Sequence, residues 1–292
     1  MDYRRLGSTE LDVSVVGIGT WQLSGIWGKH FTQEEVDGIF AVGADLGINF
    51  LDTAECYGDH LAEEFIGNAL AGRRGEWIIA TKFGHNPGND LGDENYSAAQ
   101  VQLQLEASLR ALRTDYVDLY QIHSAKLRFF DNDELWTMLD KQVQAGKVRH
   151  LGNSIFLPQA GKQMARSPAF GIAAVQTVYN LINRTAEETV FPQAREQDMG
   201  VIARTPMAMG YLTGRYRPGH VFEGDVRGML WPDEARDREI TAALAALEEK
   251  PEGVDAAAWA IAWCLENPAV STVIPGIKSE QQLRGCAAAA AL

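Results

Sequence analysis

Residues 15–53 read "VVGIGTWQLSGIWGKHFTQEEVDGIFAVGADLGINFLDT", a stretch with the pattern of one complete strand–helix–strand unit. The β-branched and apolar runs at its two ends predict buried strands. Between them, Thr32 and Glu35 form a capping box that predicts where a helix begins, and Gly47 predicts where it ends. Apolar side chains recur on one face of that helix, at Val36, Phe40 and Ala44.

Runs of the same kind recur along the whole chain. They give eight candidate strands, at residues 15–20, 49–53, 77–82, 117–123, 148–154, 173–180, 201–206 and 271–276. The strand starts are about 25 to 40 residues apart, which is the length of one βα repeat. Only the last gap is longer. A second capping box, Ser97 with Gln100, opens another of the helices between them. We therefore predict an α/β fold, a (β/α)8 TIM barrel, because a doubly wound sheet seldom has such even spacing.

Two segments depart from the repeat. Residues 3–6 and 11–14 flank a Gly7-Ser8-Thr9 turn, which predicts an N-terminal β-hairpin closing the bottom of the barrel. Residues 212–238 predict an extra loop, followed by two helices, between strands 7 and 8. Because no low-complexity linker divides the chain, we expect residues 1–292 to form a single domain.

The composition limits the partners and the location. A formal net charge of −13 would repel a phosphate backbone, so we expect no nucleic-acid partner. No window approaches the roughly 18 apolar residues of a membrane span, and the N-terminus has no signal-like apolar region. We therefore expect no membrane partner and a cytoplasmic location. The three cysteines have no C-x-x-C spacing and the six histidines no H-x-x-x-H pair, so local spacing predicts neither a disulfide framework nor a metal site.

Reactive side chains follow three successive predicted strands. The second strand ends at Asp52 and leads to Tyr57, the third ends at Lys82, and the fourth ends at His123. In a (β/α)8 barrel these strand ends face one cavity. A lysine ammonium about 4 Å from a phenol is worth about 4 kcal/mol, or roughly three pKa units, at an effective dielectric constant near 20. Each residue alone is more often structural, but their co-location predicts a proton-donating tyrosine tuned by Lys82, with His123 orienting a carbonyl.

Seven motifs resemble the successive signatures of the aldo-keto reductase superfamily. In order along nearly the whole chain they are "NFLDTAECYG", "IIATKFG", "SLRALRTDYVDLYQIH", "GKVRHLGNS", "VQTVYNLINR", "GYLTGRYRPG" and "VIPGIKSEQQL". The resemblance to the bacterial type implies a barrel that binds NADPH without a Rossmann domain and reduces an aldehyde or ketone to an alcohol. It implies Tyr57 as the general acid, with Asp52, Lys82 and His123 as its partners.

The resemblance also implies a set of NADPH/NADP+ contacts. The nicotinamide half would be held at the strand ends by Gly19, Thr20, Trp21, Asp52, Ser154, Gln176 and Arg204. The pyrophosphate and ribose would lie against Thr205, Met207, Gly210 and Leu212. The last βα loop would add Gly276, Lys278, Ser279 and Gln282. Arg215 and Arg227 match basic positions that grip the 2′-phosphate, and an arginine fork suits that dianion, so NADPH is implied over NADH. Ile155 and Cys286 replace the usual asparagines, which leaves open how the carboxamide and the adenine are held.

The substrate would be a small carbonyl compound that enters along an aromatic wall. Its contacts would be Trp21, Trp27, Tyr57, Phe83 and His123, with Phe129, Phe130 and Trp231 from the loops. Such a wall suits an apolar or aromatic carbonyl, or a sugar stacked on tryptophan. The sequence does not predict the physiological substrate, the stereochemistry or the oligomeric state.

Two other functions fit parts of the pattern. A redox-sensing subunit of the same fold would keep the cofactor with little turnover. The intact tetrad of Asp52, Tyr57, Lys82 and His123 argues against this function. A cofactor-free barrel lyase or isomerase would use the Lys82 amine as a Schiff base. A Rossmann site is excluded because Gln22 stands where the dinucleotide fingerprint needs its third glycine. Glu55 and Cys56 are given no role beyond spacers and pocket contacts.

Overall fold

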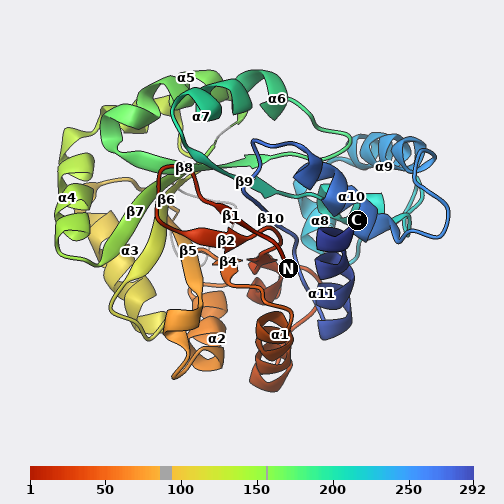
Figure 1. Cartoon of the computed structure of the whole chain (residues 1–292), viewed down its shortest axis with the longest axis horizontal. Coiled ribbons are helices and arrows are strands. Elements are labelled where there is room, and N and C mark those ends of the chain that lie inside the picture. The colour runs from red at the N-terminus through yellow and green to blue at the C-terminus, as the bar shows by residue number, and fades with distance from the viewer. Residues whose placement is uncertain (86–93, 156) are drawn as a thin grey trace.

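Eight parallel strands form the centre of the molecule. The computed structural model describes residues 1–85, 94–155 and 157–292. The strands are β3 (Ile18–Gly19), β4 (Phe50–Asp52), β5 (Ile78–Phe83), β6 (Val117–His123), β7 (Val148–Ser154), β8 (Ile172–Val178), β9 (Gly200–Arg204) and β10 (Thr272–Ile274). Parallel bridges from Val16 to Val273 and from Gly19 to Gly276 join the last strand to the first. The predicted (β/α)8 barrel is thereby confirmed (Figure 1).

Helices surround the barrel. They are α1 (Gln33–Asp45), α2 (Leu61–Ala69), α3 (Ala98–Ala111), α4 (Asp133–Gln144), α5 (Ala160–Arg166), α6 (Ala186–Thr189), α7 (Phe191–Glu196), α8 (Val226–Leu230), α9 (Asp233–Leu247), α10 (Ala256–Glu266) and α11 (Glu280–Ala287). The capping box of Thr32 and Glu35 is confirmed at the start of α1. The second box forms only in part, because the Ser97 side chain accepts from the Gln100 amide while the Ser97 amide donates to Asn95 Oδ1 at 3.2 Å.

The two predicted departures from the repeat are present. Strands β1 (Tyr3–Arg5) and β2 (Asp12–Ser14) pair antiparallel and lie across the barrel end that faces the viewer in Figure 1. The insertion between β9 and β10 contains α8 and α9 in addition to the helix α10 that completes the repeat. The sequence predicted two helices there, and α8 is the additional short one.

The barrel interior consists of an apolar layer beneath a polar layer. Alternate residues of a strand point to the same side. The apolar layer near the hairpin is a buried cluster that contains Leu6, Phe50, Ala80, Leu119, Ala174, Ile202 and Ile274. Two residues further along five of these strands stand polar side chains: Asp52, Lys82, Gln121, Gln176 and Arg204. The apolar layer thus closes the bottom of the barrel and leaves polar groups at the C-terminal ends of the strands.

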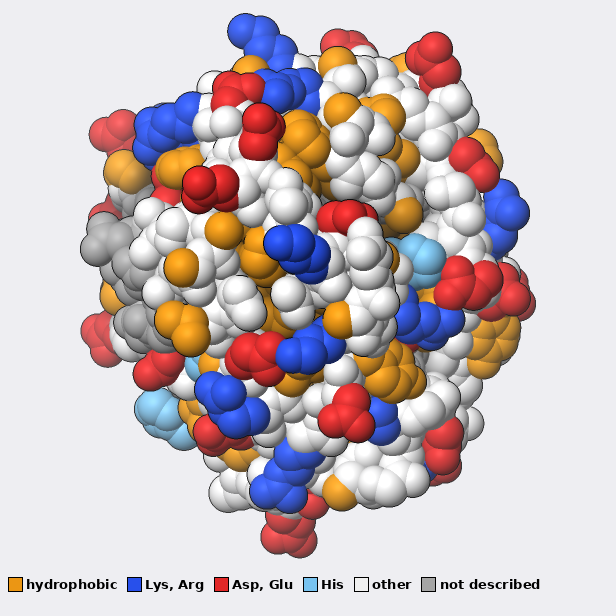
Figure 2. Space-filling view, turned by 90° about the vertical axis from the view of Figure 1, so that its left-hand side faces the viewer, with side chains coloured by type: hydrophobic (Ala, Val, Ile, Leu, Met, Phe, Trp, Pro, Cys, Tyr) orange, Lys and Arg blue, Asp and Glu red, His pale blue; other side chains and the backbone are white. Residues whose placement is uncertain are grey.

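Charged side chains of both signs are intermingled on the face drawn in Figure 2. The whole chain carries a formal net charge of −13. Among the described residues, no helix combines the length and the apolar character that crossing a membrane requires.

Replacing Leu6 with alanine should destabilise the barrel. Leu6 is fully buried, and a large-to-small change in a core costs about 2 to 5 kcal/mol. Urea unfolding would measure the loss. Leu103→Ala is the matched control, since Leu103 on α3 is 63% exposed. Equal losses in both variants would contradict the role of the hairpin as the seal of the barrel bottom.

Candidate active site

Lys82 at the end of β5 places its ammonium group inside the C-terminal end of the barrel. Its Nζ donates to Asp52 Oδ1 at 2.6 Å, to the Thr53 carbonyl at 2.7 Å and to Tyr57 Oη at 3.2 Å. The lysine is fully buried. Strand β4 supplies Asp52, and the loop that follows it supplies Tyr57. The structure therefore brings Asp52, Tyr57 and Lys82 into direct contact.

The second oxygen of Asp52 is also bound. Its Oδ2 accepts from Gln121 Nε2 at 2.9 Å and from Gln176 Nε2 at 2.7 Å. Gln176 was assigned by resemblance to the nicotinamide carboxamide, and here its amide is bound to Asp52. Sequence analysis missed Gln121. The available signal was its place two residues before His123 on the same strand, which puts both side chains on the same side of the sheet.

Burial and charge act in opposite directions on the pKa of Tyr57. Burial raises the pKa of this phenol most, the Lys82 ammonium lowers it, and the Asp52 carboxylate raises it again, so the net pKa lies above its usual range. The sequence predicts that the lysine charge dominates. It does not, because the adjacent Asp52 offsets that charge and the site is buried. Tyr57 is therefore a protonated phenol at neutral pH.

The pKa of Lys82 is raised. Burial lowers the pKa of this amine, but the Asp52 carboxylate and Tyr57 together outweigh the effect of burial. Lys82 is therefore a charged ammonium at neutral pH.

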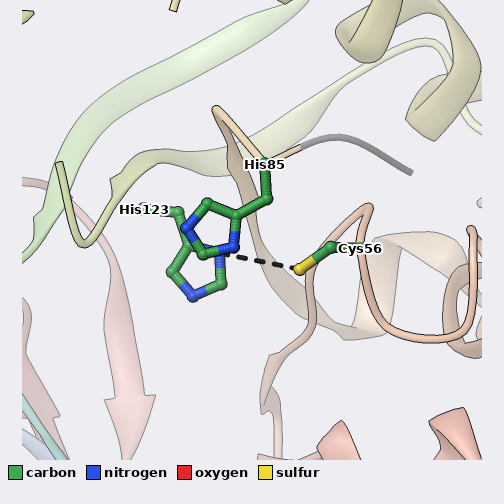
Figure 3. A group of neighbouring side chains, drawn as sticks. All are labelled: Cys56, His85 and His123. Atoms are coloured by element: carbon green, nitrogen blue, oxygen red, sulfur yellow. Dashed lines mark hydrogen bonds between the residues drawn. The ribbon is translucent and has the colours of Figure 1, made fainter. Parts of the chain in front are cut away.

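His123 at the end of β6 is a neutral imidazole. Burial, with the neighbouring His85 and Lys82, holds the pKa of His123 well below its usual range. The ring centroid of His123 lies 6.2 Å from that of Tyr57. The ring of His85 stacks on His123 with centroids 4.3 Å apart (Figure 3). His85 follows β5 three residues after Lys82 and is not among the residues predicted from the sequence. A neutral imidazole at this place can donate one N–H hydrogen bond.

A cleft of about 770 Å³ opens beside these residues. Of the residues predicted to bind cofactor, those that line it are Gly19, Thr20, Trp21, Asp52, Gln176, Arg204, Thr205, Met207, Gly210, Arg215, Arg227, Gly276, Lys278, Ser279 and Gln282. Of those predicted to contact substrate, Trp21, Trp27, Tyr57 and His123 line it. The structure therefore collects most of the predicted residues around one cavity, whose size is typical of a ligand site.

Other predicted residues lie away from the cleft wall. Phe83 is buried and packs against Tyr120, with ring centroids 4.7 Å apart. Leu212 is fully buried in the short 3-10 helix η6 (Ala208–Thr213). Ser154 is buried at the end of β7, and its Oγ has no hydrogen-bond partner within the described ranges. The loop aromatics Phe129, Phe130 and Trp231 do not line the cleft either.

The two arginines predicted to bind a 2′-phosphate have different surroundings. Arg227 is buried, and its Nε and Nη2 donate to the Asp225 carboxylate at 2.9 and 2.6 Å. Its Nη1 donates to the Met209 carbonyl at 3.1 Å, and its guanidinium lies 4.3 Å from the ring centroid of Phe222. The Arg215 guanidinium is exposed and makes no hydrogen bond or ion pair with the part of the chain that the structure describes. Arg215 is therefore available to an anion, whereas Arg227 already has a counter-ion.

Glu55 is a buried acid next to Tyr57 and Lys82. Its Oε1 accepts from the His85 backbone amide at 3.1 Å, while Oε2 has no hydrogen-bond partner among the described residues. Burial raises the pKa of Glu55 to about 8, and the nearby Glu63 carboxylate adds to the shift. Glu55 is thus mostly uncharged at pH 7.

Comparison with known proteins identifies the family. The model of the Aldo/keto reductase family matches residues 15–292. The chain is 30% identical to aldo-keto reductase YhdN of Bacillus subtilis, over 97% of this chain and 87% of that protein. It is also 30% identical to a probable voltage-gated potassium channel subunit beta of Arabidopsis thaliana, over 97% of this chain and 89% of that one. The holo structure of aldo-keto reductase AKR11C1 from Bacillus halodurans is similar with a TM-score of 0.82 and 30% identity, covering 100% and 91% of the two chains.

The protein therefore belongs to the aldo/keto reductase family. Members of this family are oxidoreductases that act on carbonyl and alcohol groups with a nicotinamide cofactor. The resemblance inferred from the seven motifs is confirmed.

The buried acid gives a prediction for the pH dependence of stability. Because the folded-state pKa of Glu55 is about 8 against 4.5 for an ordinary glutamate, the folded protein keeps a proton that the unfolded chain has lost. This contribution is complete below the unfolded-state pKa and declines as the pH rises to the folded-state pKa. Between these two pKa values, the unfolding free energy of the wild type should fall by up to about 1.4 kcal/mol per pH unit because of Glu55. Glu55→Gln should not show this part of the fall.

Urea unfolding at several pH values would measure the difference between the wild type and Glu55→Gln. Glu239→Gln, at an exposed position on α9, is the control and should follow the wild type. Parallel stability profiles for the wild type and Glu55→Gln would show that Glu55 is already ionised in the folded protein.

Proposed function

We propose that the protein is an NADPH-dependent reductase that converts an aldehyde or ketone to an alcohol, with Tyr57 as the general acid. The observation that carries the proposal is the Lys82 ammonium, which contacts Asp52 and Tyr57 at the end of the barrel where the cleft lies. When bound, the nicotinamide would supply a hydride to the carbonyl carbon.

Tyr57 would give its proton to the carbonyl oxygen as negative charge builds there. The phenol holds its proton until that moment, because its pKa is raised. Lys82 would then stabilise the phenolate, an interaction of about 4 kcal/mol at 4 Å with an effective dielectric constant near 20. Since this interaction grows only as the proton leaves, it stabilises the transition state more than the ground state. Asp52 keeps the lysine charged throughout.

His123 would orient the substrate. Its neutral ring can donate one N–H to the same carbonyl oxygen, which fixes the carbonyl beside the Tyr57 hydroxyl. The ring of Trp21 stacks beside that of Tyr57, with centroids 6.0 Å apart. It also meets the ring of Trp27 edge to face, with centroids 5.0 Å apart. An apolar, aromatic or sugar-like substrate could pack against these aromatic rings next to Tyr57.

The cleft residues fit a nicotinamide dinucleotide. Arg204 lines the cleft, and its planar guanidinium can stack on a flat ring. Ser279, at the N-terminus of α11, and Lys278 would lie near phosphate, since helix N-termini favour anions.

A Schiff-base reaction at Lys82 is disfavoured. A nucleophilic amine must be uncharged, and the raised pKa of Lys82 keeps it an ammonium at neutral pH. The direct contact with Asp52 at 2.6 Å opposes loss of the proton.

A subunit with little turnover is the second candidate. It is favoured by the 30% identity to a probable voltage-gated potassium channel subunit beta. The contact between Lys82 and Tyr57 favours the enzyme, because a cofactor sensor has no need of a tuned proton donor. Turnover with an aldehyde panel at rates typical of reductases would decide between the two.

Tyr57→Phe should abolish reduction and leave cofactor binding intact. The phenyl ring keeps the packing beside Trp21, but the proton donor is lost, so kcat should fall by about 100- to 10,000-fold. NADPH oxidation with an aldehyde panel gives the rate, and NADPH fluorescence gives the binding. Tyr120→Phe is the control, since this fully buried tyrosine does not line the cleft. An unchanged rate in Tyr57→Phe would sink the assignment of the acid.

Arg215→Met should weaken NADPH far more than NADH. Loss of one charge-assisted contact to the 2′-phosphate is worth about 1.5 to 3 kcal/mol, or roughly 10- to 100-fold in Kd. Fluorescence titration with both cofactors would measure it. Arg217→Met, in the same exposed loop, is the control. If Arg227→Met gives the NADPH-selective loss instead, then Arg227 exchanges Asp225 for the phosphate and reads it in place of Arg215.

A further inference from the structure

Three side chains with metal-binding atoms converge beside the tetrad: Cys56, His85 and His123. Cys56 follows β4, His85 follows β5, and His123 ends β6, so no local spacing in the sequence could reveal them as a set. We propose that these residues form a binding site for a thiophilic divalent cation such as zinc, and that its occupation slows turnover.

The geometry is close to what zinc requires. One ligand atom from each residue lies within 4.8 Å of the other two, and Cys56 Sγ is 3.8 Å from His123 Nδ1. Ligand atoms around a tetrahedral zinc ion stand about 3.3 to 3.6 Å apart, given bond lengths of about 2.3 Å to sulfur and 2.0 Å to nitrogen. The ligand atoms must therefore approach by up to about 1.5 Å. Because the rings of His85 and His123 are stacked at an interplanar angle of 13°, one ring must also turn so that both nitrogens point at a shared ion. Figure 3 shows the two imidazole rings lying over one another with the sulfur of Cys56 facing their edge.

One ring nitrogen of His85 is available to an ion. His85 Nδ1 is buried without a hydrogen-bond partner in the part of the chain that the structure describes. Neutral imidazole nitrogens bind zinc directly. Coordination by Cys56 would release only its thiol proton to solvent.

The backbone on both sides of the site is held by other side chains. Glu55 Oε1 accepts from the His85 amide at 3.1 Å, and Gln104 Nε2 donates to the His85 carbonyl at 2.6 Å. Tyr96 Oη donates to the His123 carbonyl at 2.6 Å. Glu55, which the sequence left without a role, is thus a support for His85. Ligands fixed in this way lose little freedom when an ion binds.

The ligand set selects the kind of ion. One thiolate and two imidazoles favour zinc and its soft or borderline analogues over magnesium, which prefers oxygen ligands. Three protein ligands leave a fourth position open, as in catalytic zinc sites. His85 and His123 line the cleft, so an ion between them and Cys56 would lie at its wall.

Occupation would disturb the proposed reaction through His123. Coordination would draw the ring toward Cys56 and away from the carbonyl that it orients. A misplacement of about 1 Å near reacting groups can cost up to about 100-fold in rate. The effect on turnover rests on the proposed reductase function, whereas the binding of the ion does not.

A calorimetric titration of the purified full-length protein with zinc would test binding directly. We expect one zinc per chain in the wild type and a loss of affinity of more than about 100-fold in Cys56→Ser, beyond what loss of a supporting contact costs. Cys264→Ser is the matched control, because Cys264 is equally buried and lies outside the cluster. His85→Gln should lose zinc as well, while His150→Gln, at a surface pair with Glu10, should retain it.

Cobalt gives a second readout that needs no variant. Cobalt bound to a thiolate has a charge-transfer band in the near ultraviolet, which we expect in the wild type. Absence of this band, or zinc binding no tighter in the wild type than in Cys56→Ser, would overturn the site.

Turnover is measured separately, by NADPH oxidation with an aldehyde in the presence of zinc. We expect a loss of about 10- to 100-fold in the wild type and resistance in Cys56→Ser. An unchanged rate at saturating zinc would overturn the inhibition. A wild type with no turnover in the absence of zinc would refute the reductase function, while the calorimetry would still decide the metal site.

Discussion

A buried ammonium group that must be neutralised is the constraint from which the polar end of the barrel follows. Lys82 is fully buried, and a charge in such a place is tolerated only when it is paired and hydrogen-bonded. Asp52 supplies the counter-charge at 2.6 Å. Its second oxygen then needs donors, which Gln121 and Gln176 supply. Four strands are thus linked by one hydrogen-bonded network, and Tyr57, Asp52 and Gln176 are its members that line the cleft.

The apolar layer below stabilises the barrel and offsets the free-energy cost of burying these charged groups. Leu6 from the hairpin and Phe50, Leu119 and Ile202 from the strands fill the bottom of the barrel. Because side chains alternate along a strand, the residue two positions after each of these strand residues also points inward, but one layer higher. The same parity explains Phe83. Since Lys82 points into the barrel, its neighbour must point outward, where Phe83 packs against aromatic rings under the helices.

Features set by local pattern could be read from the sequence, and features set by pairing across the fold could not. The strands, the hairpin and the strand-end positions of Asp52, Lys82 and His123 follow from periodicity and the rules of the barrel. Parity along a strand was also available, and it would have added Gln121 and removed Phe83. The net pKa of Tyr57 could not be foreseen, because it depends on how deeply the phenol is buried and how close Asp52 comes to Lys82. The pairing of Arg227 with Asp225 depends likewise on a loop conformation that no spacing specifies.

The charges that remain at the polar end of the barrel suit a reaction that builds negative charge. Lys82 and Asp52 cancel each other, and His123 is neutral because burial and neighbouring cations lower its pKa. Arg204 is half-buried at the cleft. Although burial lowers the pKa of Arg204, a guanidinium stays protonated in proteins. Arg204 therefore adds a positive charge at the inner end of the cleft, where Glu55 is mostly uncharged at pH 7. A positive field fixed before the reaction begins favours an oxygen that becomes negative over a neutral carbonyl, which is the electrostatic requirement of carbonyl reduction.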